Sequence, residues 1–390
     1  MSYKSIIFVT LLCIASFAIG FIIVPAYNTF RDLDFSNITD STYVHSNGID
    51  ISTLNTPKEG YHTWLSPKGN LYMGIWEEGR LSSGILITDN SVYEGELRDF
   101  SPHGYGTMYY NNGSFYRGNW VAGNKEGIGL KHNRDGSRYF GHWRAGLFNT
   151  PKDINYKLED CVYGIDISRY QHFESIKWNE LALYSDSQGD VYAYPTDNHD
   201  YMHPVTFVFI KATQGITQDP FYHQHMEKAR KHHVIVGAYH FFTIGDDIDD
   251  QISNFTQHVK IDKGDLPPVL DLENEYSKNE KKYLAELRKY GINKMHDDAI
   301  KWLTAIEAYY GVKPIIYTSE VWKKNFLADK RFDSYDFWIS RYYNVRPKNG
   351  NNWIFWQRTD AAVPHGYNKE IDVNIYNGTY KGFLNYRKSI

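Results

Sequence analysis

Two acidic residues separated by one position, Asp271 and Glu273, follow the apolar run Leu266-Pro267-Pro268-Val269-Leu270. Side chains alternate between the faces of a β-strand, so both carboxyl groups point the same way, with β-carbons on the order of 6–7 Å apart. Repulsion and burial raise the pKa of one member, which leaves a protonated acid beside a charged carboxylate. Glycoside hydrolysis uses such a pair. The Asp-x-Glu pattern is common, however, and indicates catalysis only together with its surroundings.

The surroundings consist of strand-like segments that alternate with helical ones after residue 161. The predicted strands are Val162–Ile167, Thr206–Lys211, Val234–Tyr239, Pro268–Leu272, Pro314–Tyr317, Asp336–Ile339, Trp353–Trp356 and Ile371–Val373. The predicted helices are Pro220–His233, Asp246–Val259 and Asn279–Tyr310, and a polar insertion or hairpin covers Tyr184–His203. Repeated β-α units predict a parallel sheet with helices outside. Because the last three strands are closely spaced, we expect an α/β fold with an irregular (β/α) barrel of the TIM type.

Functional residues of a parallel barrel collect at the carboxyl ends of its strands. Asp166 ends the first predicted strand, Asp271 and Glu273 end the fourth, and Asp372 lies in the last. We therefore expect all of these acids at one rim, although a solvated loop position is the alternative for Asp166 and for Asp372. Aromatic residues at or near the strand ends could stack on sugars, with core packing as the alternative. These candidate substrate-binding residues are Tyr239, Tyr317, Trp338, Tyr342 and Trp356.

Residues 161–378 resemble glycoside hydrolase family 25, the lysozymes that cut peptidoglycan between N-acetylmuramic acid and N-acetylglucosamine. The resemblance follows the family's motif order along the whole domain. The matching segments are Gly164-Ile165-Asp166-Ile167-Ser168 with Gln171 and Trp178, Phe207-Val208-Phe209-Ile210-Lys211-Ala212-Thr213 with Gly215, Gly237-Ala238-Tyr239-His240-Phe241, Leu270-Asp271-Leu272-Glu273, Trp338-Ile339-Ser340 with Tyr342, Trp356-Gln357, and Asp372 with Asn374. One departure is Gln214, where the family usually has Glu.

The resemblance implies a role for each acid. Glu273 would protonate the leaving glycosidic oxygen and then activate water, while Asp271 would stabilise the positive charge opposite, with Asp166 and Asp372 holding charge and orientation nearby. The family retains anomeric configuration through an enzyme nucleophile or through the substrate's acetamido group. Spacing on one strand does not separate these routes, and we favour acetamido participation with Asp271 polarising the group. No cofactor and no metal site is expected.

An internal repeat precedes this domain. A Tyr-x-Gly motif occurs at Tyr72, Tyr93, Tyr116 and Tyr139, at intervals of 21, 23 and 23 residues. Glycines between the copies suit tight turns that join short strands, and units of this size must stack on one another to bury a core. Residues 61–148 resemble MORN repeats, whose pattern is YxGxWxxGxxxGxG, although Leu97 stands where the second copy should have Trp. The aromatic stripe is more typical of packing than of binding, and lipid or protein partners are a suggestion from the family alone.

The amino-terminal region contains an apolar run, Ile6–Val24, preceded by Lys4. As a helix it would reach about 28 Å, enough to cross a bilayer. A cleaved signal peptide is the alternative, but the run is long and lacks a clear cleavage site. We therefore expect residues 1–26 to be a transmembrane anchor or signal, 27–60 a linker, 61–148 the MORN-repeat β domain and 160–390 the catalytic barrel. The predicted location is the bacterial cell membrane, as a single-pass protein with its catalytic domain in the periplasm or outside the cell, or secreted if the segment is cleaved.

The composition is that of a folded, globular protein rather than a disordered one. The chain has 390 residues, of which 42% are apolar and 23% charged, with 33 Tyr and 10 Trp. Its net charge of −4 gives no polyanion-binding signal, so nucleic acid is not an expected partner. The only cysteines are Cys13 and Cys161, which form no disulfide framework.

The leading interpretation is a membrane-anchored, retaining muramidase whose partner is the peptidoglycan glycan strand. The first alternative is a glycan-binding module that has lost turnover, which the retained acids disfavour. The second is a membrane-surface scaffold built on the MORN repeats. A third keeps hydrolysis but changes the substrate to chitin-like polymers of N-acetylglucosamine, which share the acetamide.

Overall fold

The structure of the protein is a computed structural model that describes residues 43–46, 49–52, 55–149, 162–186, 191, 201–274, 280–342, 346–347 and 352–388. The chain divides into two compact units, residues 1–158 and 159–390. The apolar run Ile6–Val24 lies outside the described residues. Within the described part, no helix is both long enough and apolar enough to span a bilayer.

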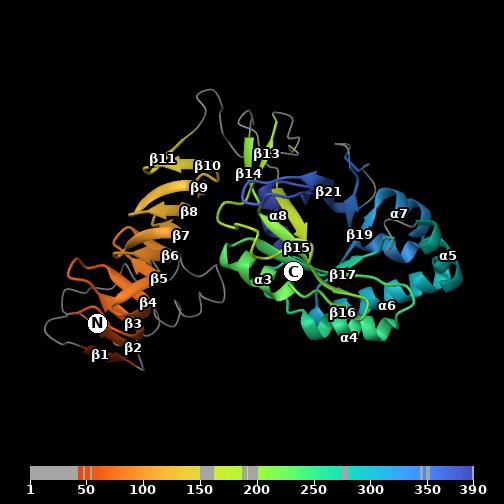
Figure 1. Cartoon of the computed structure of the whole chain (residues 1–390), viewed down its shortest axis with the longest axis horizontal. Coiled ribbons are helices and arrows are strands. Elements are labelled where there is room, and N and C mark those ends of the chain that lie inside the picture. Colours follow the sequence, from red (N-terminus) through yellow and green to blue (C-terminus); the bar gives the residue numbers. More distant parts are fainter. Residues whose placement is uncertain are drawn as a thin grey trace. The chain divides into compact units, whose positions relative to one another are not determined.

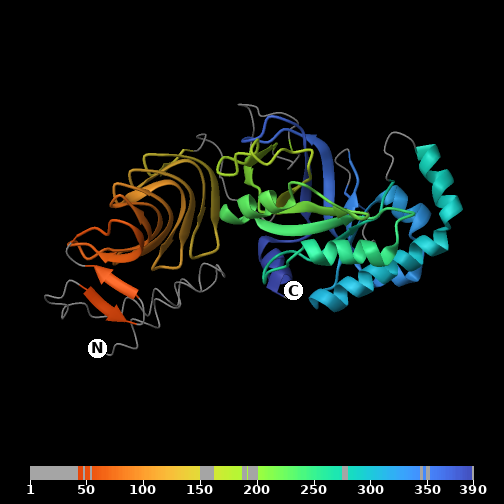
Figure 2. The same ribbon diagram turned by 60° about the horizontal axis from the view of Figure 1, so that its bottom comes forward.

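The first unit is one sheet of eleven strands whose spatial order equals their order in the sequence (Figures 1 and 2). Adjacent strands pair antiparallel, except for the parallel pair β2–β3. The strands are β1 (Tyr43–Ser46), β2 (Ile49–Ser52), β3 (Gly60–Leu65), β4 (Leu71–Glu77), β5 (Arg80–Ile87), β6 (Ser91–Arg98), β7 (Ser101–Tyr110), β8 (Phe115–Val121), β9 (Asn124–His132), β10 (Arg138–Arg144) and β11 (Leu147–Phe148). The Tyr-x-Gly motifs therefore fall on every second strand, β4, β6, β8 and β10.

The spacing of the repeat has a steric reason, which the third copy illustrates. Tyr116 is fully buried on β8, and its ring crosses over Gly129 on the next strand. A β-carbon at position 129 would lie 2.2 Å from the Tyr116 hydroxyl oxygen, so only glycine fits there. Trp120 packs edge-on against Tyr116 and Tyr93, and its indole nitrogen donates to the Gly106 carbonyl at 3.1 Å. The aromatic stripe of the repeats is thus the core of this unit.

The second repeat differs from the others at its hairpin turn. The residue pairs Glu78-Gly79, Ala122-Gly123 and Ala145-Gly146 have positive φ at both positions, as two-residue turns between twisted strands require. In the second copy Phe100 occupies the glycine position, with φ 60°. Its ring packs against Trp64, Tyr72 and Trp76. Because Leu97 replaces the tryptophan of this copy, Phe100 supplies an aromatic ring beside Tyr72.

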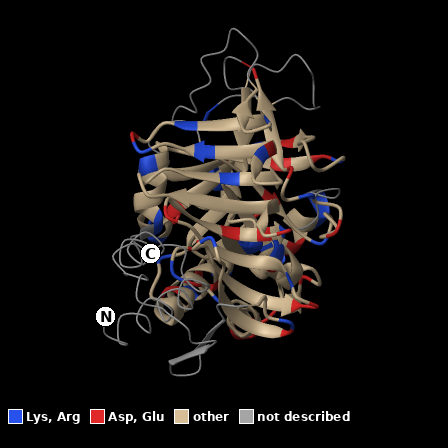
Figure 3. Ribbon diagram, turned by 90° about the vertical axis from the view of Figure 1, so that its left-hand side faces the viewer, with Lys and Arg blue, Asp and Glu red and all other residues tan. Residues whose placement is uncertain are grey.

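Charged residues of both signs are distributed over the strands seen in Figure 3. This mixed pattern matches the small net charge of the chain, −4.

The second unit contains a closed barrel of the strands β12 (Val162–Ile167), β15 (Phe207–Gln214), β17 (Ile235–Phe241), β18 (Val269–Asp271), β19 (Ile315–Ser319), β20 (Asp336–Ser340), β21 (Trp353–Ala362) and β22 (Ile371–Tyr376). The pairing of β12 with β15 closes the ring. These strands run parallel to their neighbours except β22, which is antiparallel to both β21 and β12. The predicted irregular barrel is therefore confirmed. The orientation of its last strand differs from the expected parallel sheet, because the eight residues between β21 and β22 are too few for the crossover that a parallel pair requires.

Two apolar layers hold the barrel. The inner layer includes Phe207, Phe209, Val269, Ile315 and Phe355, and the outer layer lies between strands and helices. The helices are α3 (Tyr222–Lys231), α4 (Ile248–His258), α5 (Glu280–Tyr290), α6 (Ile292–Tyr310), α7 (Glu320–Phe326), the 3₁₀ helix η1 (Lys330–Ser334) and α8 (Tyr380–Lys388). The smaller strands are β13 (Ala182–Ser185) and β14 (Tyr201–Pro204), which pair as the predicted hairpin, and β16 (Thr217–Gln218), which pairs with β15.

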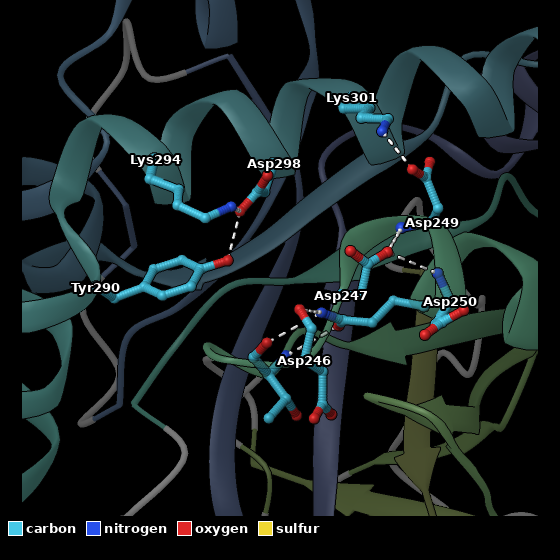
Figure 4. A network of polar contacts seen from close by, with 10 residues as sticks. Asp246, Asp247, Asp249, Asp250, Tyr290, Lys294, Asp298 and Lys301 are labelled. Atoms are coloured by element: carbon cyan, nitrogen blue, oxygen red, sulfur yellow. Dashed lines mark hydrogen bonds and ion pairs between the residues drawn. The ribbon is translucent and has the colours of Figure 1, made fainter.

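The predicted helix Asn279–Tyr310 consists of two helices, so the prediction of one continuous helix was wrong. Gly291, with φ 97°, ends α5 and precedes α6. Figure 4 shows the polar contacts that hold these helices and α4. Lys294 donates to Asp298 at 2.7 Å and Tyr290 bonds to the same carboxylate, while Lys301 of α6 reaches Asp249 of α4 at 2.7 Å. The side chain of Asp247 caps α4.

Candidate active site

Strand register brings two of the acids together at one end of the barrel. Asp166 lies near the carboxyl end of β12, and Asp372 lies near the amino end of β22. The two residues are direct partners in the antiparallel ladder. A last strand of reversed direction therefore delivers Asp372 to the same rim as the carboxyl ends of the parallel strands.

The other two acids come from β18. Asp271 is its last residue, and its neighbours in register are Phe241 of β17 and Tyr317 of β19. Glu273 lies two residues beyond the strand, where the chain bends, rather than within it. The Leu272 amide still donates to the Tyr317 carbonyl at 2.9 Å, which keeps the segment against the sheet. Asp271 is 4% exposed, whereas Glu273 is partly exposed, so only the second is open to solvent.

Buried amides fix the orientation of Asp166. Its Oδ1 accepts from Gln357 Nε2 at 2.9 Å and from Asn374 Nδ2 at 2.8 Å. Gln357 Oε1 in turn accepts from the hydroxyls of Tyr317, at 2.8 Å, and Tyr342, at 3.1 Å. Because an amide oxygen only accepts and an amide nitrogen only donates, this network permits a single orientation of Gln357. The network therefore connects β19, the segment between β20 and β21, β21 itself and β12.

Burial raises the pKa values of all four acids, and repulsion by neighbouring acids adds to the shifts of Asp271, Glu273 and Asp372. Burial raises the pKa of Asp166 to about 6, although hydrogen bonds from Asn374 and Gln357 oppose the shift. Burial and the charge of Asp166 raise the pKa of Glu273 to about 7, against the effect of Lys211. The pKa of Asp271 is raised well above its usual value by burial and then by Glu273. At neutral pH the pair Asp271–Glu273 therefore retains a proton.

A hydrogen bond links the side chains of Asp372 and Asp166. Burial and the Asp166 charge raise the pKa of Asp372 well above its usual value. The hydrogen bond between the two opposes the rise in the pKa of Asp166 that burial causes.

Lys211, at the carboxyl end of β15, is the cation that faces this group. Its Nζ donates to Gln214 Oε1 at 2.6 Å and lies 4.6 Å from the centroid of the Phe241 ring. Burial lowers the pKa of Lys211, and the charges of Asp271 and Asp219 oppose that shift. Since Gln214 carries a neutral amide, its contact with Lys211 does not neutralise the ammonium charge, which acts on the neighbouring acids.

The candidate aromatic residues separate into two groups. Tyr239, Tyr317 and Trp338 belong to the inner layer of the barrel, and Tyr342 is a partly exposed residue at the rim. The charges of Asp166 and Asp271 contribute to the raised pKa values of Tyr239 and Tyr317, after burial. Trp338 is 2% exposed, packs on Phe209, and donates from its indole to Asn374 Oδ1 at 2.8 Å.

Trp356 is not brought to this group. It packs in the outer layer between barrel and helices, and its indole donates to the Arg341 carbonyl at 2.7 Å. The neighbouring residue, Gln357, points to the inner face instead and bonds to Asp166. The alternation of side chains along β21 explains why one of two adjacent residues serves the core and the other the acids.

Gln357, Asn374 and Lys211 were not among the predicted site residues. Asn374 could have been predicted from its spacing. In a strand, Asp372-x-Asn374 places both side chains on the same face. No local pattern marks Lys211 or Gln357 as polar residues of a barrel interior.

The described residues contain no group of three or more His, Cys, Asp or Glu side chains that could hold a metal ion. The arrangement instead offers a partly exposed proton donor, a buried carboxylate beside it and oriented amides below. Such a set suits acid–base chemistry.

Comparison with known proteins identifies the family. The family model described as Glycosyl hydrolases family 25 matches residues 165–367, more than half of the chain. The protein belongs to glycosyl hydrolase family 25. It is therefore a glycoside hydrolase, and the predicted resemblance of its second unit is confirmed. The matched region includes Asp166, Asp271 and Glu273, and ends before Asp372.

Similar proteins include one in Escherichia coli. The uncharacterized protein YegX of strain K12 is 34% identical over 220 residues, which cover 56% of this chain and 70% of YegX. Among solved structures, a family 25 glycosyl hydrolase from Bacillus anthracis is 26% identical, with 58% of this chain and 93% of that chain covered and a TM-score of 0.44. The bacterial lysozyme from Streptomyces coelicolor is 23% identical, with 58% and 97% covered and a TM-score of 0.46.

Proposed function

We propose that this family 25 glycoside hydrolase is a peptidoglycan hydrolase, a lysozyme of the N-acetylmuramidase type. It cleaves the β-1,4 bond between N-acetylmuramic acid and N-acetylglucosamine with retention of configuration. One observation carries the proposal: Glu273 and Asp271 lie side by side at the barrel rim and keep a proton at neutral pH. Solved structures of similar proteins include a bacterial lysozyme and a muramidase from Trichobolus zukalii, which accords with this substrate.

Glu273 is the general acid and base. Its pKa of about 7 leaves a large share of the molecules protonated at neutral pH, and its partial exposure lets a glycosidic oxygen reach it. In the first step the Glu273 proton moves to the leaving oxygen as the bond to C1 breaks. The resulting carboxylate then removes a proton from the water that attacks C1.

Asp271 stabilises the intermediate. Within the described structure its Oδ1 is buried and accepts no hydrogen bond. An unsatisfied buried acceptor costs about 1–3 kcal/mol, and an N–H from the substrate would satisfy it. The acetamido N–H of the sugar is such a donor. With that N–H bound, the acetamido oxygen attacks C1 and forms a positively charged ring, which the Asp271 carboxylate stabilises. Direct attack by an enzyme carboxylate is the alternative route to retention.

Asp166 and Asp372 hold charge and orientation behind the pair. The two amides that donate to Asp166 favour its ionised form, and a hydrogen bond links Asp166 to Asp372. The charge of Asp166 then raises the pKa of Glu273, which keeps the proton of the general acid in place.

The test is the release of reducing ends from purified peptidoglycan by the full chain. Glu273→Gln should abolish release, because an amide cannot donate the acid proton, and Asp271→Asn should reduce it by about 10²–10³-fold. The control is Glu286→Gln, which changes a partly exposed glutamate of α5 that pairs with Lys282. Full activity in Glu273→Gln overturns the assignment. Mass spectrometry of the products identifies the bond, since a new muramic acid end and a new glucosamine end differ in mass.

The same experiment addresses the other readings. Cleavage of N-acetylglucosamine polymers in preference to peptidoglycan would favour the chitin-like substrate. Binding without release by the unchanged chain would favour a glycan-binding module, and a scaffold role for the repeats would show as wall turnover that does not depend on Glu273.

For the amino-terminal half, we propose that Ile6–Val24 anchors the protein in a bacterial membrane and that residues 61–148 are MORN repeats acting as a spacer or a lipid- or protein-binding surface. The length of the apolar run and the regular Tyr-x-Gly motifs support this. Cell fractionation with and without residues 1–26 tests the anchor, and recovery of the shortened chain in the membrane fraction would contradict it.

A further inference from the structure

The loop that follows β12 is held rigidly by its own polar contacts. The Ser168 amide donates to Gln171 Oε1 at 3.0 Å, and the Gln171 amide donates to the Ser168 carbonyl at 3.0 Å. From outside the loop, Asp219 Oδ2 accepts from the Arg169 amide at 2.9 Å. The backbone of Arg169 and Tyr170 is therefore fixed before any ligand arrives, so little conformational entropy is lost when they bind one.

Both side chains nevertheless point to solvent. Tyr170 is 74% exposed and Arg169 is also exposed, with the guanidinium carbon 5.6 Å from the Tyr170 ring centroid. Some arginines of this unit are neutralised by ion pairs, as Arg230 is by Asp262 and Arg341 is by Glu320. Within the described part of the chain, Arg169 makes no ion pair. A rigid loop thus presents an open aromatic face and an unneutralised cation together.

The pair lies next to the candidate active site. Arg169 is three residues from Asp166 on the loop at the carboxyl end of β12. Arg169 and Tyr170 both lie within electrostatic range of Lys211, which is also within range of Asp271. Two cations, Arg169 and Lys211, therefore lie close enough to interact near the acids, and they would attract an anionic substituent of a bound sugar.

We propose that Arg169 and Tyr170 form a binding site for the carboxylate-bearing substituent of the glycan, with the tyrosine ring stacked on the sugar and the guanidinium paired with the carboxylate. The inference rests on the proposed function. The shared chemistry is a carboxylate attached through O3 of muramic acid. It comes either from the stem peptide of an intact strand or from the lactyl group of a strand stripped of its peptides. Selectivity for muramic acid over N-acetylglucosamine then arises at this pair.

The experiment measures kcat and KM of the full chain on three soluble glycan strands. These are strands with stem peptides, strands stripped by an amidase, and stripped strands whose carboxylates are blocked as methylamides. Arg169→Gln should raise KM by about tenfold on each strand that supplies the recognised carboxylate, with kcat unchanged and no change on blocked strands. An effect on peptide-bearing strands alone identifies the stem peptide as the source, and an effect on stripped strands identifies the lactyl group.

Tyr170→Ala should raise KM on all three strands, because stacking does not require the charge, and Tyr170→Phe should preserve the wild-type KM. Matched controls are Arg288→Gln and Tyr309→Ala, which change exposed residues of α5 and α6. Equal KM values for Arg169→Gln and wild type on both carboxylate-bearing strands overturn the proposal. So does an equal rise on blocked strands, since the arginine would then act only on loop structure.

Failure of the proposed function is distinguishable from failure of this inference. If the unchanged chain releases no reducing ends from any strand, calorimetry still compares the binding of stripped and blocked strands to wild type and to Arg169→Gln. Preference of wild type for the carboxylate, lost in Arg169→Gln, supports the site without turnover. Equal binding of both strands by wild type overturns it.

Discussion

The two units of this chain build their interiors from opposite kinds of contact. In the repeat sheet each strand pairs with the strands next to it in sequence, and the core is formed by rings such as Tyr93, Tyr116 and Trp120 from consecutive copies. In the barrel, Asp166 accepts hydrogen bonds from residues 191 and 208 positions away. A damaged repeat therefore affects its neighbours, whereas the acids depend on closure of the whole barrel.

The largest loss of activity should follow a substitution that removes a hydrogen bond between the first and last strands of the barrel. Asn374→Leu keeps the branching of the side chain but removes the donor to Asp166 and the acceptor of the Trp338 indole. We expect kcat to fall on the order of 100-fold, because the orientation of Asp166 is lost, with destabilisation of about 2–3 kcal/mol from the unpaired buried groups. Steady-state kinetics and urea unfolding measure both. Asn325→Ala, at an exposed position of α7, is the control, and wild-type kcat in Asn374→Leu would contradict the role of closure.

A comparable loss of stability, confined to the other unit, should follow Gly118→Ala. A β-carbon there would lie 2.5 Å from the Gly129 Cα and 2.7 Å from the Ile128 carbonyl oxygen. We expect the sheet to lose about 2–3 kcal/mol, while hydrolysis of soluble strands stays at the wild-type rate. Scanning calorimetry should show a lower transition temperature for the repeat sheet alone. A matched fall in kcat would show that the two units are coupled.

A smaller effect concerns the pH dependence of the barrel's free energy of unfolding. The pKa of Glu273 is raised in the folded state to about 7, so the folded state binds more protons than the unfolded state between about pH 4.5 and pH 7. Stability from this group is present below that window and is lost as the pH rises through it. Glu273→Gln should therefore stabilise the barrel by about 1–2 kcal/mol at pH 8 and by nothing at pH 4. The free energy of unfolding at the two pH values tests the sign, and equal differences would refute it.

The pKa of Glu273 also predicts how activity declines at alkaline pH. Hydrolysis by the unchanged chain should decline as the pH rises through about 7, since ionised Glu273 cannot protonate the leaving oxygen. Measurement of kcat/KM from pH 4 to pH 9 gives the limb, and a plateau up to pH 9 would speak against Glu273 as the acid.

The smallest expected change in stability concerns Phe100, where unfavourable backbone strain and favourable ring packing can be separated. Its φ of 60° is unfavourable for a residue with a β-carbon, but its ring packs on Trp64, Tyr72 and Trp76. Phe100→Gly loses the ring and gains a favourable backbone, whereas Phe100→Ala loses the ring alone. We expect the glycine variant to be about 1 kcal/mol more stable than the alanine variant. The reverse order in thermal unfolding would mean that the turn relaxes to another conformation.

Local pattern was enough to predict most of the barrel. Each predicted strand after residue 161 corresponds to an observed strand, because buried parallel strands are short apolar runs bounded by turns. The pattern did not reveal the break at Gly291, since glycine inside a helical period is tolerated until its φ is known. It also gave no direction for β22, because strand direction follows from connection length and closure rather than from the residues of the strand.

The candidate site was predictable only where residues are close in sequence. Asp271 and Glu273 share one segment, so their proximity follows from spacing alone. Convergence of Asp166 with Asp372 required the barrel, and the amide of Gln357 required knowledge of which β21 face points inward. Trp356 illustrates the limit: adjacent to Gln357 in sequence, it faces the opposite layer.

The reversed direction of β22 also decides where the barrel connects to the rest of the chain. Val162 and Tyr376 are register partners at one pole, and Asp166 and Asp372 are partners at the other. The first strand thus starts, and the last one finishes, at the pole remote from the carboxylates. Both strand ends that connect to the flanking chain therefore lie opposite the acids, so a change in either connection leaves the register that pairs Asp166 with Asp372 intact.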